Sequence, residues 1–226
     1  MASRVEVESA EFALEGGLRG VGIDVLARGR VSLRLAERRY TERERAAFAE
    51  ARDVPFAARE AVIKAVGGAG VLGAPLREIE LAWEGGRLVL RPGPRYRDIM
   101  TAEGVASVRL FDIAARHDHV IVGCLAASDA PPSRVRVAWA LVAVDGADET
   151  TLSPEEAAFA RTRPTPRASI ATRNAAHAAA RALGLADPRV IGGGDDPPRL
   201  AGVTGAHLSL AHEDHLAAAL VALTAR

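Results

Sequence analysis

Several features that define whole classes of protein are scarce in this chain of 226 residues. It has one cysteine, Cys124, so an internal disulfide is excluded, and the apolar run at 120–125 indicates a small buried thiol. Lys+Arg and Asp+Glu number 29 each, so the formal net charge is zero and attracts neither nucleic acid nor an anionic membrane. The first 15 residues are interrupted by Glu and Arg and carry no secretory signal or apolar span. We therefore expect a cytoplasmic protein without nucleic-acid or membrane partners.

The length and the apolar content indicate two closely associated halves. Hydrophobic residues make up 49% of the sequence, which is ample for a core. The chain exceeds one typical domain of about 100–150 residues but is short for two independent ones.

The first part of the chain alternates strand and helix patterns up to a clear break. A strand is expected within 20–31, helices at 41–52 and 55–66, a hairpin at 79–90, a short helix or loop at 96–103, and strands at 106–111 and 119–125. Thr41 and Glu44 have the spacing of a capping box. Residues 126–133 interrupt every periodicity, and we place a boundary there.

The second part restarts the same plan. A long apolar strand is expected at 135–144, with helices at 153–161 and 167–183. Residues 157–160 repeat 46–49, and 173–175 resemble 59–61 in the same order, which argues for duplication. We therefore predict two halves, at 1–127 and 134–226, that each combine strands and helices.

Three separated segments carry the chemistry. Gly22-Ile23-Asp24 ends an apolar strand pattern, residues 56–65 read FAAREAVIKA on a helix, and residues 207–214 read HLSLAHED. Together they resemble the phosphopantetheinyl transferase superfamily, whose members carry G-I-D, then K-E-A-x-x-K-A, then S-L-S-H. The resemblance implies a pseudodimer of two similar α+β halves, each an antiparallel sheet packed with helices. The order of the motifs looks like two small holo-acyl-carrier-protein synthases fused head to tail.

The resemblance implies transfer of the 4′-phosphopantetheine arm of coenzyme A to a carrier-protein serine. Asp24 and Glu60 are then the expected Mg²⁺ ligands and catalytic residues, because Mg²⁺ is usually held by one or two carboxylates and substrate phosphates. Lys64 lies four residues after Glu60, hence on the same helical face, and is expected to act in catalysis and on the phosphate. The general base stays open among the glutamate, the lysine and a metal-bound water.

Further residues are expected to bind coenzyme A. The resemblance places His212 on the pyrophosphate, with Ser209 as its neighbour, and it assigns Arg59 and Gly68 to the nucleotide side.

A single site between the halves follows from what each half retains. The first half keeps Asp24, Glu60 and Lys64, whereas the second has Asn174 in place of the glutamate. When the two halves are aligned without gaps in this region, Ser209 and His212 of the second half correspond to Ile113 and Arg116 of the first.

The expected partner is an acyl or peptidyl carrier protein, which presents an acidic helix beside its serine. Arg28 and Arg30 follow Asp24 closely, and Arg30 stands where the family has an arginine that meets this acidic helix, so both are the expected docking residues. For Arg28 a solvated arginine surface is the alternative. The sequence leaves open which carrier is served.

Departures from the family pattern keep alternatives open. Ala27, Pro55 and Ala211 replace residues that are frequent in the family. Asp24 by itself fits a turn cap, and Glu60 with Lys64 fits an exposed ion pair. The alternative is an inactive transferase-like scaffold that still binds a carrier protein or coenzyme A.

Overall fold

The computed structural model describes residues 5–67, 76–113, 118–193 and 196–224. The chain divides into two compact units. We call Glu15–Pro131 the central unit and the combination of Met1–Leu14 with Pro132–Arg226 the terminal unit. Both are α+β, and every strand pairing between described residues is antiparallel.

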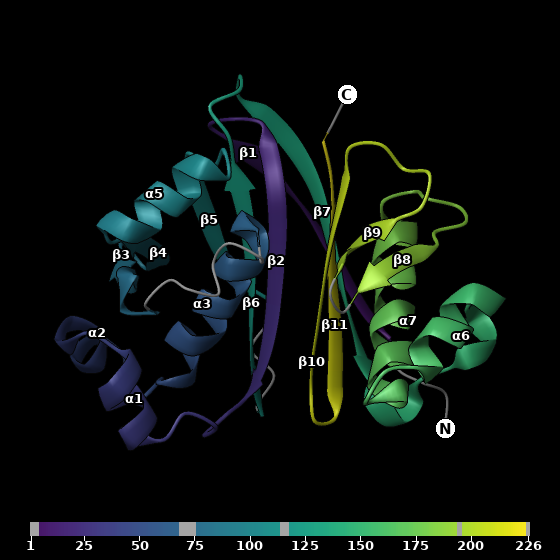
Figure 1. Ribbon diagram of the computed structural model, residues 1–226, viewed down its shortest axis with the longest axis horizontal. Coiled ribbons are helices and arrows are strands. Elements are labelled where there is room, and N and C mark those ends of the chain that lie inside the picture. The colour runs from purple at the N-terminus through teal and green to yellow at the C-terminus, as the bar shows by residue number, and fades with distance from the viewer. Residues whose placement is uncertain (1–4, 68–75, 114–117, 194–195, 225–226) are drawn as a thin grey trace. The chain divides into compact units, whose positions relative to one another are not determined.

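The central unit is a three-stranded sheet in the order β2-β6-β5, accompanied by a separate hairpin. Its elements run β2 (Leu18–Ala27), α1 (Leu33–Arg39), α2 (Glu42–Ala47), α3 (Asp53–Val66), β3 (Ile79–Glu84), β4 (Arg87–Pro92), α5 (Pro94–Ala102), β5 (Ser107–Asp112) and β6 (His119–Ala127). Helix α3 lies along one face of the sheet (Figure 1). The expected strands, hairpin and second helix are confirmed, whereas the helix expected at 41–52 ends at Ala47 and α1 was not foreseen.

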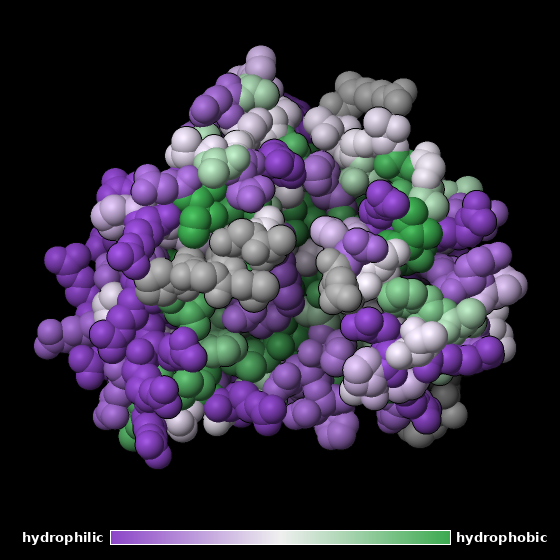
Figure 2. Space-filling model, in the orientation of Figure 1, coloured by the Kyte–Doolittle hydropathy of each residue, from purple (hydrophilic) through white to green (hydrophobic). Residues whose placement is uncertain are grey.

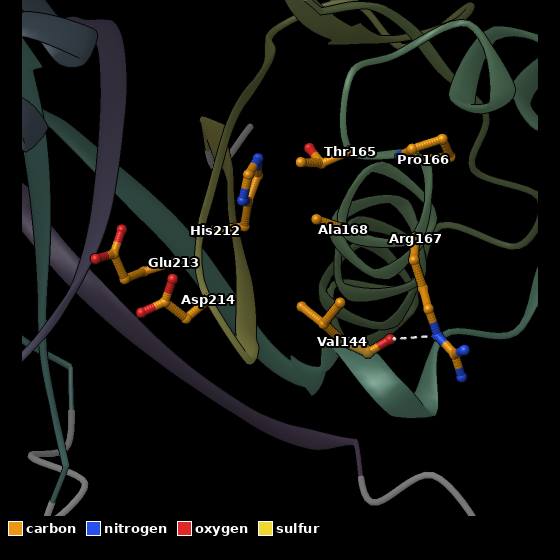
Figure 3. Close-up of a pocket in the computed structure, with 8 residues that line it drawn as sticks. All are labelled: Val144, Thr165, Pro166, Arg167, Ala168, His212, Glu213 and Asp214. Carbon is orange, nitrogen blue, oxygen red and sulfur yellow. Dashed lines mark hydrogen bonds between the residues drawn. The ribbon is translucent and has the colours of Figure 1, made fainter.

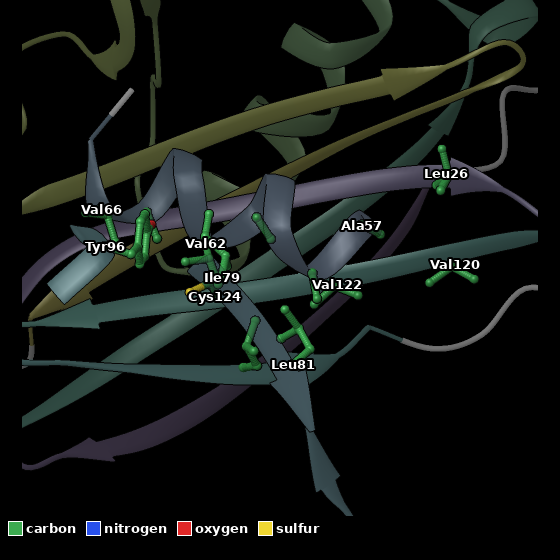
Figure 4. Close-up of a cluster of buried hydrophobic side chains, with 14 of the residues drawn as sticks. Leu26, Ala57, Val62, Val66, Ile79, Leu81, Tyr96, Val120, Val122 and Cys124 are labelled. Carbon is green, nitrogen blue, oxygen red and sulfur yellow. The ribbon is translucent and has the colours of Figure 1, made fainter. Parts of the chain in front are cut away.

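The core of the central unit forms between α3, the sheet and the hairpin. Figure 4 shows Val62 of α3, Val122 of β6 and Ile79 of β3 converging there, each buried completely. Glycine in β2 permits the close packing, because a Cβ added at Gly22 would stand 1.8 Å from the carbonyl oxygen of Ala61. The same close approach brings one face of α3 over the end of β2.

The terminal unit repeats this plan with one added strand, and its sheet has the order β1-β7-β11-β10. Its elements are β1 (Glu6–Leu14), β7 (Ser133–Ala143), α6 (Pro154–Arg161), α7 (Pro166–Ala182), β8 (Val190–Gly193), β9 (Asp196–Leu200), β10 (Ala206–Glu213) and β11 (Leu216–Thr224). Without β1, the order β7-β11-β10 matches β2-β6-β5, and the hairpin β8-β9 stands at the chain position of β3-β4.

The buried face of α3 has a buried counterpart in α7. Adding 114 to the numbers of the buried α3 residues from Ala57 onward gives residues of α7 that are all buried too. The guanidinium of Arg59 lies 4.6 Å from the ring centre of Tyr40, and that of Arg173 lies 4.6 Å from the ring centre of Phe159. The duplication inferred from the sequence is therefore visible in packing as well as in strand order.

Both units also use a buried capping-box glutamate in the same way. Glu44 at the start of α2 accepts a hydrogen bond from the backbone of Leu81 in β3 at 2.8 Å. Glu156 at the start of α6 accepts one from the backbone of Val190 in β8, also at 2.8 Å. Each glutamate thereby ties a helix to a hairpin.

The central unit ends at Pro131, and residues 1–14, which we assigned to the first half, group instead with the terminal unit. Strand β1 pairs along its whole length with β7, from Glu6 opposite Leu141 to Leu14 opposite Ser133, and so belongs to the terminal unit. Strand β1 lies at the edge of the sheet and is largely exposed, so it tolerates several Glu residues. These residues break the apolar pattern by which a strand is recognised in a sequence. Among the described residues, no helix combines the length and apolarity needed to cross a membrane.

Candidate active site

Three predicted residues meet where β2 and α3 lie side by side in the central unit. The Lys64 ammonium donates to the Asp24 carboxylate at 2.8 Å and to the Ile23 carbonyl oxygen at 2.9 Å. Glu60 precedes Lys64 by one helical turn, so both side chains project from the same face of α3. Lys64 is the only lysine in the chain, whose other basic side chains are arginines and histidines.

The electrostatics of this cluster favour a cation. Burial raises the pKa of Asp24, and the charge and hydrogen bond of Lys64 only partly offset this. Burial also raises the pKa of Glu60, and the negative charge of Asp24 raises it further, while Lys64 lowers it. Two carboxylates therefore share a poorly hydrated place with one ammonium group. A further positive charge there would relieve their mutual repulsion.

Two carboxylates suit a cation that completes its shell with water and substrate oxygens. Within the described ranges, no group of three or more His, Cys, Asp and Glu side chains could hold a metal ion. An enclosed protein cage is therefore not formed by these residues. Asp24 and Glu60 instead fit Mg²⁺, which commonly takes only one or two protein carboxylates.

Arg59 does not belong to this cluster, which corrects its expected role as a coenzyme A ligand. Its side chain is 2% exposed, donates to Glu44 at 2.5 Å, and also donates to the carbonyl oxygen of Ile79 at 2.9 Å. It points into the core of the central unit. Arg59 precedes Glu60 directly but projects from the buried face of α3. Its role is therefore structural.

Gly68 lies outside the described residues. Its neighbour Gly67 ends α3 with a φ of 130°, in a conformation that favours glycine.

Ser209 and His212 lie on the same strand but on opposite faces of the sheet. Strand β10 pairs with β11 in unbroken register from Ala206 to Glu213, so residues three apart point in opposite directions. Ser209 is buried, whereas His212 is exposed. The expectation that Ser209 and His212 contact the same ligand side by side is therefore wrong.

His212 lines a pocket of about 480 Å³ in the terminal unit. As Figure 3 shows, its imidazole lies on the side of β10 that faces Thr165 and Ala168 at the start of α7, whereas the Glu213 carboxylate points away. The remaining lining residues are Val144, Pro166, Arg167 and Asp214. The Arg167 guanidinium donates to the Val144 carbonyl oxygen at 3.2 Å and so is already engaged.

The strand registers revise the expected counterpart of His212. In the terminal unit His212 lies opposite Ala217, which pairs with Val142 of β7. The corresponding last helix-facing row of the central unit is Asp112, Val122 and Asp24. Asp112 therefore matches His212, and Ile113 does not match Ser209. Arg116, the counterpart given by the ungapped alignment, lies outside the described residues. That alignment failed because the β5-β6 connection (113–118) is longer than the β10-β11 connection (214–215).

Asn174 occupies the α7 position that corresponds to Glu60. Its side-chain amide accepts from the Asp148 backbone nitrogen at 2.9 Å and donates to the Asp148 carbonyl oxygen at 2.9 Å and the Thr151 hydroxyl at 2.8 Å. The side chain is thus committed to the loop after β7. In the terminal unit this position has become structural.

The two expected docking arginines are exposed at the end of β2. Arg28 and Arg30 follow the strand directly, before α1 begins at Leu33. Hydrophilic side chains cover the neighbouring surface over α1 and α2 (Figure 2). Sequence reasoning missed the residue that holds this loop, Asp53. It also missed Asp112, whose pKa is raised by burial and lowered by the charge of Arg28.

No family model matches this chain, and no curated protein matches it. Among solved structures, it is similar to holo-[acyl-carrier-protein] synthase from Neisseria meningitidis, with 26% identity over 48% of this chain and 98% of that one, and a TM-score of 0.42. An ADP-bound acyl carrier protein synthase from Plasmodium yoelii shares 17% identity over 53% and 98%, with a TM-score of 0.43. A synthase complex with coenzyme A from Chronobacterium ammoniagenes shares 21% identity over 48% and 96%, with a TM-score of 0.36.

Proposed function

We propose that this protein transfers the 4′-phosphopantetheine arm of coenzyme A to a serine of an acyl or peptidyl carrier protein. The observation that carries the proposal is the convergence of Asp24, Glu60 and Lys64 from β2 and α3. This cluster joins two of the three motifs that resemble the transferase superfamily. Its charges are those needed where a pyrophosphate reacts.

Mg²⁺ is the proposed cofactor, held by Asp24 and Glu60. When bound, it would neutralise negative charge on the pyrophosphate oxygens as the bond to the leaving nucleotide breaks. The raised pKa values of both carboxyl groups support this assignment, because a divalent cation returns such groups to their charged form.

Lys64 is proposed to contact the phosphate that undergoes attack. Its ammonium is fixed by Asp24 and by the Ile23 carbonyl oxygen, so its orientation costs little when the substrate binds. In the reaction the serine oxygen forms a bond to phosphorus, the pyrophosphate P–O bond breaks, and the serine proton leaves to a base.

We further propose one site per chain, to which the terminal unit contributes His212 as a donor to the pyrophosphate. At the positions of Asp24 and Glu60 the terminal unit has Val142 and Asn174, and Asn174 is committed to a structural loop. The central unit has Asp112 where a phosphate-binding histidine would stand, and a carboxylate there repels phosphate. Each unit therefore retains only one half of the required groups.

The carrier protein is proposed to dock on the loop after β2. Arg28 and Arg30 are exposed there and complement an acidic helix.

The decisive experiment incubates purified apo-carrier proteins of fatty-acid, polyketide and peptide-synthetase type with coenzyme A, Mg²⁺ and this protein. Intact-protein mass spectrometry should show one carrier gaining the mass of one phosphopantetheine arm. The gain should disappear with EDTA and return with added Mg²⁺. Binding of coenzyme A and of a carrier without any mass gain would overturn transfer and leave the scaffold alternative.

A further inference from the structure

Asp53, the first residue of α3, uses its carboxylate to hold the loop after β2. One oxygen accepts from the backbone nitrogen of Gly29 at 2.7 Å, and the other accepts from the backbone nitrogen of Val31 at 2.8 Å. The residue is 9% exposed, so these two bonds are largely shielded from water. Charged acceptors in such surroundings form strong hydrogen bonds.

This carboxylate is not needed to begin its own helix. The N-cap residue of α3 is Arg52, and no side chain caps the start of the helix. Both Asp53 oxygens instead act on a segment more than twenty residues earlier in the chain. The contact therefore serves the loop.

The backbone of the loop is fixed at several further points. The nitrogen of Arg28 donates to the Asp118 carbonyl oxygen at 2.8 Å, and that of Arg30 donates to the Ala27 carbonyl oxygen at 3.3 Å. Gly29 has a φ of 80°, which disfavours any residue with a Cβ. The backbone is thus held from both sides, while the side chains of Arg28 and Arg30 stay exposed.

The two elements that hold the reactive groups also hold this loop. Strand β2 carries Asp24 and continues directly into Arg28, about 13 Å further along an extended chain. Helix α3 carries Glu60 and, seven residues earlier, Asp53, about 10 Å away along the helix axis. The two Asp53 hydrogen bonds connect α3 to the loop after β2, at the end of both elements that is remote from Asp24 and Glu60. The distance from the exposed arginines to the carboxylate pair is thereby fixed.

We propose that Asp53 is a positioning residue for carrier recognition, which sets the loop of Arg28 and Arg30 at a fixed distance from the reacting phosphate. This inference rests on the proposed function. A carrier held at that loop must deliver its serine to the pyrophosphate, so freedom in the loop weakens docking and misplaces the serine. Coenzyme A contacts neither Asp53 nor this loop in the proposal.

The test compares Asp53→Asn with the wild-type protein. An amide cannot accept from both backbone nitrogens, because one of its two groups is itself a donor. We expect the KM for the carrier to rise at least about five-fold, while the KM for coenzyme A changes less than about two-fold. Asp98→Asn, which alters an exposed acid on α5, should change neither. Equal effects on both substrates, or no effect on the carrier, would overturn the inference.

A second variant reaches the loop without touching Asp53. Gly29→Ala adds a Cβ that has no heavy atom within 4 Å, so only its backbone conformation is penalised. It should reproduce the selective rise in carrier KM. Gly85→Ala is the matched control, because Gly85 also has a positive φ and open space but lies in the β3-β4 turn. If Gly85→Ala shows the same rise, the effect is one of general stability and the inference fails.

A double-mutant cycle shows whether Asp53 acts through Arg30. With Arg30→Ala already present, Asp53→Asn should add little to the loss of carrier binding, whereas additive losses would contradict the proposed route. Binding of a fluorescent apo-carrier separates the two hypotheses. If a carrier binds in an Asp53-dependent way but is never modified, the proposed function fails, and the role of Asp53 in carrier binding remains. If Asp53→Asn transfers to the carrier as the wild-type protein does, the inference fails and the proposed function is unaffected.

Discussion

The ammonium of Lys64 in α3 lies 2.8 Å from the carboxylate of Asp24 in β2, and Glu60 stands one helical turn before that lysine. The ion pair is partly shielded, with 13% of the Asp24 side chain and 32% of the Lys64 side chain exposed. It joins the strand and the helix that we propose to hold the metal ion. Several consequences of this arrangement can be measured.

Replacing Glu60 with Gln should abolish transfer and yet stabilise the fold at neutral pH. Loss of a metal ligand removes several kcal/mol of transition-state stabilisation, or at least about 100-fold in kcat/KM. The folded-state pKa of Glu60 is raised, so its ionised form disfavours the folded state. That cost is absent below the ordinary carboxyl pKa and develops as pH rises through the folded-state value.

Urea titrations without Mg²⁺ should therefore show a larger free energy of unfolding for Glu60→Gln at pH 7 and an equal one near pH 4. Glu50→Gln, at an exposed site of the same unit, is the control and should change neither activity nor stability. Near wild-type turnover of Glu60→Gln at saturating Mg²⁺ would contradict the metal assignment.

Because Lys64 is the only lysine, an amine-reactive reagent labels one side chain and the N-terminal amine. Coenzyme A with Mg²⁺ should protect Lys64 from reductive methylation and leave the N-terminus, the internal control, unaffected. Peptide mass spectrometry measures both. Undiminished labelling of Lys64 at saturating ligand would show that the phosphate does not reach it.

Arg30→Glu should raise the KM for the carrier by at least about ten-fold and leave that for coenzyme A nearly unchanged, because it reverses a charge facing an acidic helix. Added salt should weaken wild-type carrier binding, since exposed charges are screened over about 10 Å at 0.1 M. Arg97→Glu on α5 carries the same charge change and should have little effect. A fall in coenzyme A affinity would instead assign Arg30 to the nucleotide.

His212→Ala should raise the KM for coenzyme A by at least about ten-fold, because the pyrophosphate would lose a donor from the terminal unit. His215→Ala, two residues beyond β10, is the matched control. Asp112→Asn should leave transfer within about two-fold, and calorimetry should find one coenzyme A per chain. Two bound molecules per chain would show that each unit keeps a complete site.

Glu156→Gln should destabilise the protein in a pH-dependent manner without altering substrate binding. Burial raises the pKa of Glu156, but hydrogen bonds from His177 and the backbone of Val190 and Ser153 outweigh it, and the pKa falls to about 2. Its contribution is thus present above the ordinary value of 4.5 and is lost as pH falls towards 2. At pH 7 we expect a loss of about 1–3 kcal/mol in the free energy of unfolding.

The difference between Glu156→Gln and the wild-type protein should shrink as pH falls from 4.5 towards 2. Glu155→Gln, at the exposed neighbouring position, should be neutral throughout. A pH-independent difference would mean that the carboxylate charge is not what stabilises the α6-β8 connection.

Local patterns in the sequence were sufficient for much of the fold and for one cluster of the site. Apolar runs marked β2, β6 and β7, and the spacing of Glu60 and Lys64 placed both on one face of α3. Such signals are local, since they depend only on the repeat of a strand or a helix. They also revealed the duplication, whose strand order and helix burial the structure reproduces.

Long-range pairing decided the rest. The membership of β1 in the terminal unit depends on its partner β7, more than a hundred residues away, and its own exposed residues carry no trace of that pairing. The burial of Arg59 depends on its ion pair with Glu44. The role of Asp53 depends on the backbone nitrogens of Gly29 and Val31, which donate to its carboxylate. The matching of His212 with Asp112 required hairpin registers, because loops of unequal length shift one strand against another without altering its sequence pattern.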